Sequence, residues 1–500
     1  MPGIISFIAK PLGRYVRRRV QSMAMNALQD QAAIFDHLIY KAKETQFGHN
    51  HGFEKIRTVH EFRERVPVRD YEGIKDYIQK IKEGQQNVLW PGAPVYFAKT
   101  SGTTSGIKYI PLTKESIPYH FNSARNAVFN YASQINDFTY LDGKLIFLSG
   151  SPETSMAGKI KSGRLSGLVN LYIPTLFKRS QLPSYATNCI EDWDTKVEKI
   201  IDECIGQDLR LISGIPPWVQ MFAERILTRT GKSHIREVFP NLKMLVSGGV
   251  NFAPYKSHYN RLFGEDIPRV DTYPASEGFI GFQYAPGDPA LILNTNAGIF
   301  FEFVTLDELK KEQPTRLQLS EVQPGVTYAI LLSTNAGMWC YNIGDTIEFV
   351  SVNPFRFIIN GRVSQYISAF GEHVIEKEVE TALLKTCEKH QCTVNEFTIA
   401  PQVNPADLGK PYHEWFIDFE LPPTNLIGFT ADLDHAMRFQ NIYYDDLITG
   451  NILRPIQIRL MKHLAFRDFM RDIGKLGGQN KIPHLRNDRK IADGLKTYQQ

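Results

Sequence analysis

The sequence predicts an α/β protein with a large N-terminal domain and a smaller α+β domain at its C-terminal end. Short apolar runs that end in Gly, Ser or Pro alternate with helical stretches up to about residue 287. Buried strands that alternate with helices are typical of a largely parallel sheet. Beyond residue 287, strand-like runs follow one another in quick succession, which is typical of an antiparallel subdomain. At roughly 150 residues per domain, 500 residues are enough for two or three domains.

The composition is that of a folded protein and excludes several functional classes. Apolar residues make up 43% and charged residues 22% of the chain, so it can build a full core. The net charge of +4 is too small over this length to predict nucleic acid as a partner. No apolar run approaches the roughly 20 residues of a membrane span. The five scattered cysteines do not form a disulfide framework and predict a reducing, cytoplasmic location.

Residues 1–20 combine apolar side chains with a cluster of positive charges. Apolar residues at positions 4, 5, 7, 8 and 12 surround Lys10, and arginines follow at positions 14, 17, 18 and 19. A secretory signal would place its charges before a longer apolar core, so we do not expect one. We favour a helix that packs on its own domain and exposes a basic face to solvent. A helix that makes weak contact with a membrane surface, or that targets an organelle, is the alternative.

The N-terminal domain is expected to begin with a helix and to continue with buried strands. From residue 19 to about residue 43, apolar side chains recur at the spacing of one helix face. Short apolar runs predict strands at residues 145–148, 209–212 and 243–246. A helix is expected at residues 218–227, between the second and third of these strands.

The second half of the chain is predicted to change from strands alone to a mixture of helices and strands. Strands are expected at residues 291–294, 299–304, 327–332 and 346–352. After Gly361, helices are expected at residues 378–385 and 432–439, and strands at residues 396–400 and 413–421. We place the main boundary at Gly361–Arg362, which gives domains of residues 1–360 and 361–500.

The most informative stretch is residues 99–108, Lys-Thr-Ser-Gly-Thr-Thr-Ser-Gly-Ile-Lys. Its hydroxyl side chains and glycines disfavour the interior of a helix or strand. Such a loop can present backbone N–H groups and hydroxyls to the oxygens of a polyphosphate, and Lys108 adds a positive charge. It is not a Walker loop, because the Gly-x4-Gly-Lys-Ser/Thr spacing is absent. A polar surface loop without a ligand is the alternative.

Residues 271–278 follow a strand-like run and bring three useful side chains together. Tyr273 could stack on a purine, and Ser276 and Glu277 supply a hydroxyl and a carboxylate suited to Mg²⁺. A loop whose serine and glutamate cap a helix is the alternative.

Two more stretches complete the pattern. Asp345 in Tyr-Asn-Ile-Gly-Asp could accept hydrogen bonds from both ribose hydroxyls, with a plain β-turn aspartate as the alternative. Residues 355–362 lead into the last domain and end in Gly-Arg. Near the C-terminus, residues 474–483 place Lys481 on a glycine-rich loop.

The order of these features resembles that of the AMP-forming adenylate enzymes, which include acyl-CoA synthetases, luciferases and peptide-synthetase adenylation domains. Within that superfamily the chain resembles the auxin-responsive Gretchen Hagen family of acyl acid amido synthetases. The resemblance rests on the residue 100–106 loop followed by Ile110-Pro111, on Tyr273-Pro-Ala-Ser-Glu277, on the Phe-Arg-Phe run at residues 355–357 and on Gln-Asn-Lys-Ile-Pro at residues 479–483. It covers nearly the whole chain, from about residue 45 to residue 486.

The resemblance implies a role for each matching residue. The phosphates of ATP would lie against Ser101, Gly102, Thr103, Thr104, Ser105, Gly106 and Lys108. The adenosine would lie against Ser247, Gly248, Gly249, Tyr273, Ser276, Asp345 and Arg362. Glu277 would hold Mg²⁺, and Lys481 would reach across the cleft to the reacting carboxylate and α-phosphate. The implied catalytic residues are thus Lys481, Glu277 and Thr103.

The resemblance also implies the reaction. ATP, with Mg²⁺, would convert a carboxylic acid into an acyl-AMP, and the acyl group would then pass to an amine such as an amino acid. Because carboxylate and triphosphate are both anionic, such a site must neutralise charge before they meet. Residues 1–360 would form the adenylate-forming domain, and residues 361–500 a mobile domain that carries Lys481. We expect this domain to rotate about Gly361–Val363 after adenylation and to withdraw Lys481.

Two other functions stay open. An acyl-CoA ligase would use the same first step and transfer the acyl group to a thiol. A nucleotide-binding protein without catalysis would use only the binding residues. Neither the acid nor the acceptor can be identified from the sequence.

The pocket for the acid is less distinct. Arg125, on a helix expected at residues 116–133, could pair with an anionic group, although a structural arginine fits equally well. Ile215, Trp218 and Phe252 suggest an apolar wall for an aromatic or aliphatic acid, with core packing as the alternative.

The chain departs from the family pattern at two places. Val363 follows the Gly-Arg pair where many relatives have Asp or Lys. His484 follows Pro483 where the family has Arg, and Arg486 is the residue that could supply the missing charge.

Overall fold

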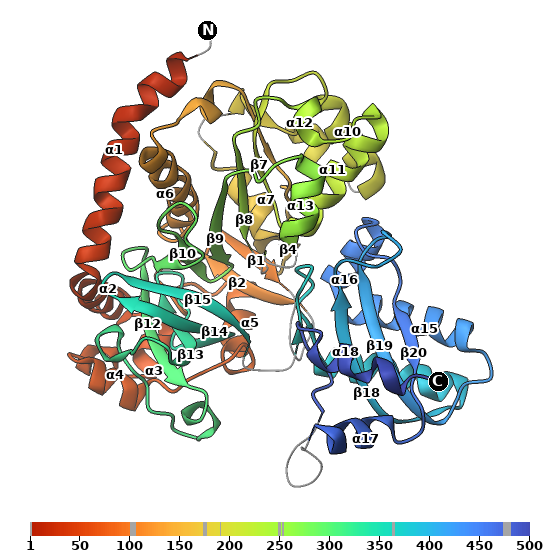
Figure 1. Ribbon diagram of the computed structural model, residues 1–500. Helices are drawn as coiled ribbons and strands as arrows, with labels where there is room; N and C mark the ends of the chain where they lie inside the picture. Colours follow the sequence, from red (N-terminus) through yellow and green to blue (C-terminus); the bar gives the residue numbers. More distant parts are fainter. Residues whose placement is uncertain are drawn as a thin grey trace.

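The computed structural model describes residues 3–100, 107–173, 178–190, 192–248, 252, 255–362, 366–473 and 482–500. Figure 1 shows a large N-terminal part and a smaller C-terminal part, drawn in blue, that lie beside each other. The predicted residues Ser101 to Gly106, Gly249, Val363 and Lys481 lie outside the described residues. Among the described residues, no helix has both the length and the apolar character needed to cross a bilayer.

The N-terminal part is built on one long mixed sheet. Within the described residues its order is β12-β13-β14-β15-β11-β10-β9-β8-β7-β3-β6. The strands are β3 (Lys144–Phe147), β6 (Gln181–Leu182), β7 (Leu209–Ser213), β8 (Met244–Gly248), β9 (Arg269–Ala275), β10 (Gly278–Gln283), β11 (Leu291–Leu293), β12 (Ile299–Thr305), β13 (Thr327–Thr334), β14 (Tyr341–Val352) and β15 (Phe355–Arg362). The run from β6 to β9 is parallel, and β10 to β15 pair antiparallel.

The predicted parallel and antiparallel regions are both present, and the structure adds that they share this sheet. The pairing changes from parallel to antiparallel between β9 and β10. A tight turn joins these two strands, because Ala275 pairs with Gly278 and only two residues lie between them. The apolar runs are strands because both sheet faces are covered. In β12 the buried Glu302 interrupts such a run, and its carboxylate lies 3.1 Å from Arg63 and 3.2 Å from Arg316.

A second sheet of four strands lies beside the first, in the order β2-β1-β5-β4. Its strands are β1 (Tyr96–Thr100), β2 (Lys108–Leu112), β4 (Ser155–Ala157) and β5 (Ile160–Gly163). β1 and β2 pair antiparallel, with Thr100 opposite Lys108. The residue 101–106 loop therefore connects two paired strand ends.

Helices cover the sheets. They are α1 (Ile4–Met25), α2 (Ala27–Ala42), α3 (Gln46–Asn50), α4 (Val59–Arg65), α5 (Lys75–Lys82), α6 (Ile117–Ile135), α7 (Leu165–Asn170), α9 (Tyr185–Asn188), α10 (Trp193–Cys204), α11 (Pro216–Thr230), α12 (Ile235–Val238) and α13 (Lys256–Phe263). α6 packs on β9 and β10, and α1 packs on α6 at the outer edge of the molecule (Figure 1). The helix predicted at residues 19–43 is two helices, because the backbone of Asn26 leaves the helical conformation between α1 and α2.

The C-terminal part has the predicted mixture of helices and strands. Its elements are β16 (Tyr366–Ile367), β17 (Val374–Ile375), α14 (Glu376–His390), β18 (Thr393–Gln402), β19 (Tyr412–Leu421), α15 (Leu426–Gln440), α16 (Ile442–Thr449), β20 (Gln457–Leu460), α17 (Ala465–Asp472) and α18 (Lys490–Leu495). β18, β19 and β20 form one sheet, and α14 packs against α15. The predicted strand at residues 413–421 is β19, and its residues Trp415, Phe416 and Ile417 are all fully buried.

Candidate active site

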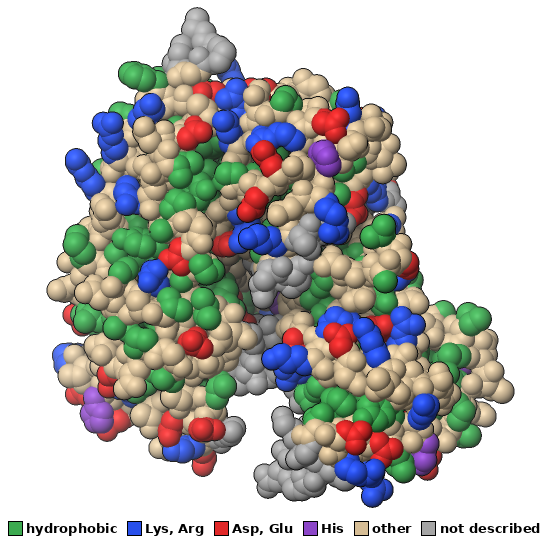
Figure 2. All heavy atoms as spheres, viewed as in Figure 1, with side chains coloured by type: hydrophobic (Ala, Val, Ile, Leu, Met, Phe, Trp, Pro, Cys, Tyr) green, Lys and Arg blue, Asp and Glu red, His purple; other side chains and the backbone are tan. Residues whose placement is uncertain are grey.

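A cavity of about 1010 Å³ lies at the boundary between the N-terminal and C-terminal parts. Figure 2 shows the surface hollowed between these two parts. Every predicted site residue whose side chain is described lines this cavity: Lys108, Arg125, Ile215, Trp218, Ser247, Gly248, Phe252, Tyr273, Ser276, Glu277 and Asp345. The alternatives in which these residues form unrelated loops or core packing predict no such convergence.

The predicted purine-binding motif is a strand and a tight turn rather than a loop. Tyr273 lies within β9, and Ser276 and Glu277 form the turn into β10. No helix follows Glu277, so the helix-capping alternative is wrong. The turn places Ser276 and Glu277 on the cavity wall beside the buried ring of Tyr273.

Asp345 lies inside β14, so the β-turn alternative is also wrong. The phenol of Tyr273 donates a hydrogen bond to its carboxylate, although the two residues are 72 positions apart. Arg362 stands opposite Asp345 in the β14–β15 register. This hydrogen bond joins the predicted adenine-stacking and ribose-binding residues, although β10, β11 and β15 lie between β9 and β14 in the sheet order.

The end of β8 passes close to β9 on the same side of the cavity. A Cβ atom on Gly248 would lie 2.6 Å from the carbonyl oxygen of Thr272, so only glycine permits this approach. The hydroxyl of Ser247 is buried and has no hydrogen-bond partner among the described residues. Because buried polar atoms are normally paired, this hydroxyl fits a hydrogen bond to a ligand such as the nucleotide.

The charges on the cavity wall suit a polyphosphate and a magnesium ion. Lys99, Thr100 and Lys108, which flank the residue 101–106 loop, all line the cavity. The ammonium groups complement phosphate charge, and a carboxylate such as that of Glu277 is the ligand type that Mg²⁺ takes beside phosphates. The residues present therefore fit both groups.

The wall formed by α6 is largely apolar. Phe121, Ala124 and Val128 line it, together with the buried His120, whose pKa burial lowers to about 4. His120 is therefore neutral near pH 7. Arg125 donates hydrogen bonds to the side chain of Asn126 at 3.0 and 3.3 Å, and desolvation lowers its pKa.

Residues that the sequence did not single out form the wall on the C-terminal side. Ser368, His373, Tyr443 and Asn487 all line the cavity. Nδ1 of His373 lies 2.7 Å from the hydroxyl of Ser368, and the backbone N–H of Ser368 donates to Asn487 at 2.8 Å. A sequence feature that could have pointed to this wall is Gly-Glu-His at residues 371–373, between two short apolar strands.

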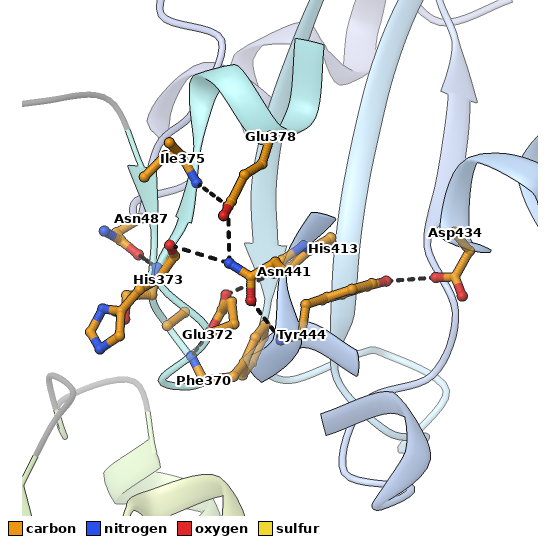
Figure 3. Close-up of polar contacts among 12 residues, drawn as sticks. Phe370, Glu372, His373, Ile375, Glu378, His413, Asp434, Asn441, Tyr444 and Asn487 are labelled. Atoms are coloured by element: carbon orange, nitrogen blue, oxygen red, sulfur yellow. Dashed lines mark hydrogen bonds and ion pairs between the residues drawn. The ribbon is translucent and has the colours of Figure 1, made fainter. Parts of the chain in front are cut away.

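Buried polar groups support the residue 368–373 loop on the side opposite the cavity (Figure 3). The carboxylate of Glu372 lies 2.7 Å from His413 and accepts a hydrogen bond from the backbone of Phe370 at 2.8 Å. Glu378 accepts bonds from the backbone of Ile375 and from Asn441, and burial raises its pKa to about 7. The wall is therefore rigidly supported.

Direct contacts join the two parts of the chain at the cavity. Arg164 forms an ion pair with Asp446, and its guanidinium lies 5.0 Å from the centre of the Tyr443 ring. The phenol of Tyr443 donates to the carbonyl of Lys99 at 3.1 Å, and that of Tyr255 donates to the carbonyl of Ala369 at 2.5 Å. These contacts hold α16 and the residue 368–373 loop against the N-terminal part.

The departure at His484 has a structural counterpart. Its Nδ1 lies 2.8 Å from Glu376, its Nε2 lies 3.2 Å from Glu396, and these carboxylates raise its pKa. Arg486 instead forms an ion pair with Asp488. Glu376, Glu380 and His484 are also close enough to share a metal ion. The raised pKa favours an imidazolium that pairs with the carboxylates instead.

Comparisons with known proteins agree with this architecture. Models of the GH3 family match the chain in three segments: the N-terminal domain model at residues 16–174, the central domain model at residues 292–362 and the C-terminal domain model at residues 377–490. An indole-3-acetic acid-amido synthetase of Arabidopsis thaliana, GH3.3, is 20% identical over 91% of this chain and 88% of its own. A jasmonoyl–L-amino acid synthetase of Nicotiana attenuata, JAR4, is 21% identical over 84% of this chain and 85% of its own.

A solved structure shows the same fold. The AtGH3.15 acyl acid amido synthetase in complex with 2,4-DB superposes with a TM-score of 0.63 at 15% identity, covering 98% of this chain and 96% of that chain. The predicted fold class and the predicted family are therefore confirmed. The three family models together match more than half of the sequence, and the chain belongs to the GH3 family.

Proposed function

We propose that this GH3-family protein is an ATP-dependent ligase that adenylates a carboxylic acid and transfers the acyl group to the amine of an amino acid. One observation carries the proposal: a single cavity collects Tyr273, Glu277, Asp345 and both ends of the residue 101–106 loop. The relatives GH3.3 and JAR4 are named as amido synthetases, which supports the same reaction type.

The nucleotide would occupy the side of the cavity formed by the central sheet. Tyr273 would stack on adenine, Asp345 would accept hydrogen bonds from the ribose, and the hydroxyl of Ser247 would bond to the base. The phosphates would meet Lys108 and the backbone of the residue 101–106 loop. Mg²⁺ held by Glu277 would neutralise phosphate charge and favour departure of pyrophosphate.

The acid would approach from the apolar wall of α6. That wall suits an aromatic or aliphatic tail, with Ile215, Trp218 and Phe252 on adjacent elements. Lys481 would offset the negative charge as a carboxylate oxygen attacks the α-phosphate. Positioning and charge neutralisation, rather than a covalent protein intermediate, would supply the rate.

Residues 361–500 would act as a mobile domain. Ile482 to Arg486, the described residues directly after Lys481, do not line the cavity. On the C-terminal side, Ser368, His373 and Tyr443 line it instead. We take the observed arrangement as the one for acyl transfer, after adenylation is complete. A rotation about Gly361–Val363 would replace the wall of Ser368, His373 and Tyr443 by the segment that carries Lys481.

The same proposal covers partners and location. The substrates would be small molecules, and neither the charge nor the site suits nucleic acid. All five cysteines are free thiols, in keeping with a cytoplasmic location.

The test is ATP–pyrophosphate exchange with a library of carboxylic acids. Exchange that depends on an added acid supports adenylation, and its absence with every acid would favour a nucleotide-binding protein without catalysis. Acceptors are then compared on the best acid. Amide formation with amino acids is the expected result, and product formation only with coenzyme A would identify an acyl-CoA ligase.

A further inference from the structure

The wall on the C-terminal side of the cavity contains a histidine with the geometry of a general base. His373 lines the cavity and is partly exposed to it. Figure 3 shows its ring directed away from the buried network of Glu372, Asn441 and Tyr444. Its Nδ1 lies 2.7 Å from the hydroxyl of Ser368. A base whose second nitrogen is held by another side chain is a recurrent arrangement in enzymes.

The backbone around His373 is held in an unfavourable conformation. Its φ angle is +49°, in the left-handed region that non-glycine residues rarely adopt. Asn441 donates to its carbonyl oxygen at 3.4 Å, and Asn487 fixes Ser368 on the other side of the loop. Such strain persists only where surrounding contacts impose it, and it concentrates at functional sites.

We infer that His373 is the catalytic base of acyl transfer, an assignment that rests on the proposed function. The acceptor amine, neutral after losing one proton to solvent, forms a bond from its nitrogen to the acyl carbon. The bond from that carbon to the phosphate oxygen breaks, and its electron pair leaves with AMP. The proton released by the new amide nitrogen passes to Nε2 of His373 and then to solvent. When Nδ1 carries hydrogen and donates to Ser368, Nε2 presents the lone pair that this step needs.

The test separates the two half-reactions. In His373→Gly, which relieves the backbone strain, aminolysis of purified acyl-adenylate should fall at least 100-fold while acid-dependent pyrophosphate exchange stays within about threefold. Added imidazole should restore part of the aminolysis rate. His373→Asn tolerates the same φ angle, lacks a basic nitrogen and should behave like His373→Gly without imidazole. Ser368→Ala should lower the aminolysis rate about tenfold. His60→Gln, at an exposed histidine distant in the sequence, is the control and should leave that rate unchanged.

The outcomes that overturn the assignment are distinct from failure of the proposed function. If wild type gives no acid-dependent exchange, the proposed function fails. If exchange is intact and His373→Gly keeps aminolysis within threefold, His373 is not the base. Equal loss of both half-reactions without imidazole rescue would give His373 a structural role only.

A second, independent observation concerns α1. One face of this helix is buried against the N-terminal part through Ala9, Val16, Val20 and Met23. The opposite face carries two adjacent exposed stripes, one of residues 7, 11, 14 and 18 and one of residues 8, 12, 15 and 19. The helix therefore confirms the expected packing and also leaves a long face uncovered.

The composition of that face is unusual for a solvated surface. Phe7 is 73% exposed, Ile8 67% and Tyr15 56%. Arg14, Arg18 and Arg19 continue the two stripes, and the first acidic residue of the chain is Asp30. Figure 1 shows α1 along the edge of the molecule, with its N-terminal end projecting beyond the body. Among the described residues these arginines form no ion pair, and apolar side chains beside such arginines match the boundary between acyl chains and anionic headgroups.

We propose that α1 binds the surface of anionic phospholipid membranes. Phe7, Ile8 and Leu12 would enter the headgroup region, and the arginines would meet lipid phosphates. A protein partner or a second copy of the chain would match the apolar residues but would need acidic groups opposite the arginines. Adjacent surfaces of a second α1 offer none, because the helix has no acidic residue.

Vesicle flotation tests this proposal on the full chain. Binding to phosphatidylcholine vesicles containing about one-third phosphatidylglycerol should exceed binding to phosphatidylcholine alone at least tenfold and should weaken with salt. Phe7→Ser combined with Ile8→Ser, and Arg14→Gln combined with Arg18→Gln and Arg19→Gln, should each lose at least tenfold. A matched control removes three exposed positive charges elsewhere, with Lys55, Lys75 and Lys199 changed to Gln, and should bind as wild type.

Equal binding to both kinds of vesicle would overturn the proposal. So would equal losses in the arginine variant and the lysine control. Self-association that Phe7→Ser abolishes, without any vesicle binding, would assign the face to a second copy of the chain.

Discussion

The phenol of Tyr273, on β9, donates a hydrogen bond to the carboxylate of Asp345, on β14. Both strands belong to the same sheet, although β10, β11 and β15 lie between them in its order. A ribose placed at Asp345 would compete with this phenol for the carboxylate. When no nucleotide is bound, the hydrogen bond from Tyr273 holds the carboxylate of Asp345 in position.

Removing the carboxylate should weaken ATP binding more than removing the phenolic hydroxyl. We expect Asp345→Ala to raise the KM for ATP about 10- to 100-fold, because hydrogen bonds to a charged group contribute about 1.5–3 kcal/mol. Tyr273→Phe keeps the stacking ring and should change KM less than about threefold. Pyrophosphate exchange at varied ATP concentration measures both, and equal damage by the two variants would contradict the assignment.

Lys481 should be needed for one half-reaction only. Lys481→Ala is expected to abolish pyrophosphate exchange, because the positive charge at the reacting carboxylate is lost, and to spare amide formation from supplied acyl-adenylate. Lys475→Ala, on the same glycine-rich stretch, is the matched control and should retain exchange. Equal loss of both half-reactions in Lys481→Ala would argue against domain rotation.

The ion pair of Arg164 with Asp446 should favour acyl transfer over adenylation, because it joins the two parts of the chain in the observed arrangement. Arg164→Gln and Asp446→Asn should each slow aminolysis of acyl-adenylate about five- to tenfold and leave pyrophosphate exchange unchanged or faster. The double variant should be no slower than either single variant. This corresponds to a coupling free energy of about 1 kcal/mol between the two residues. Tyr443→Phe should act in the same direction but more weakly, and additive losses would show that the pair does not act as a unit.

The buried carboxyl of Glu378 should make stability depend on pH. Its pKa is about 7 in the folded chain against 4.5 as the ordinary value, mainly through burial. Between these values the folded state binds more protons than the unfolded state, so the free energy of unfolding falls as pH rises from 4.5 to 7. It then stays lower at higher pH, by about 3–4 kcal/mol, since one pKa unit corresponds to about 1.36 kcal/mol.

Glu378→Gln removes this titration and keeps an oxygen for the hydrogen bonds from Ile375 and Asn441. Urea unfolding should show the variant as stable as wild type at pH 5 and more stable at pH 8. Glu388→Gln, an exposed position on the same helix α14, should change neither value. A variant that is less stable than wild type at both pH values would show that the carboxylate is stabilising.

Most strands and helices could be predicted because their periodicity is local. The run at residues 299–304 is β12, and the strand predicted at residues 413–421 is β19. The break at Asn26 was missed because the apolar spacing continues across it. The pairing of β11 with β15, which joins β12 to β15 to the rest of the sheet, was not predictable, since it depends on contacts between residues more than 60 positions apart.

The nucleotide side of the candidate site was accessible from sequence, because its residues stand in motifs with their own chemistry. Tyr273 and Asp345 were singled out separately, but their hydrogen bond depends on how the folded chain brings β9 and β14 together. Ser368 and Asn487 carry no motif and acquire a role only where the fold places them, 119 positions apart, on one wall. The position of His373 depends in addition on buried groups behind its loop, which no local pattern reveals.

The two walls of the cavity are encoded in separate stretches of the gene product. Apart from Lys481, the residues proposed for the nucleotide and the acid lie at or before position 362, and Ser368, His373, Tyr443 and Asn487 follow it. A chimera that takes its sequence after this position from another GH3 protein would inherit the donor's choice of amine and keep the host's choice of acid.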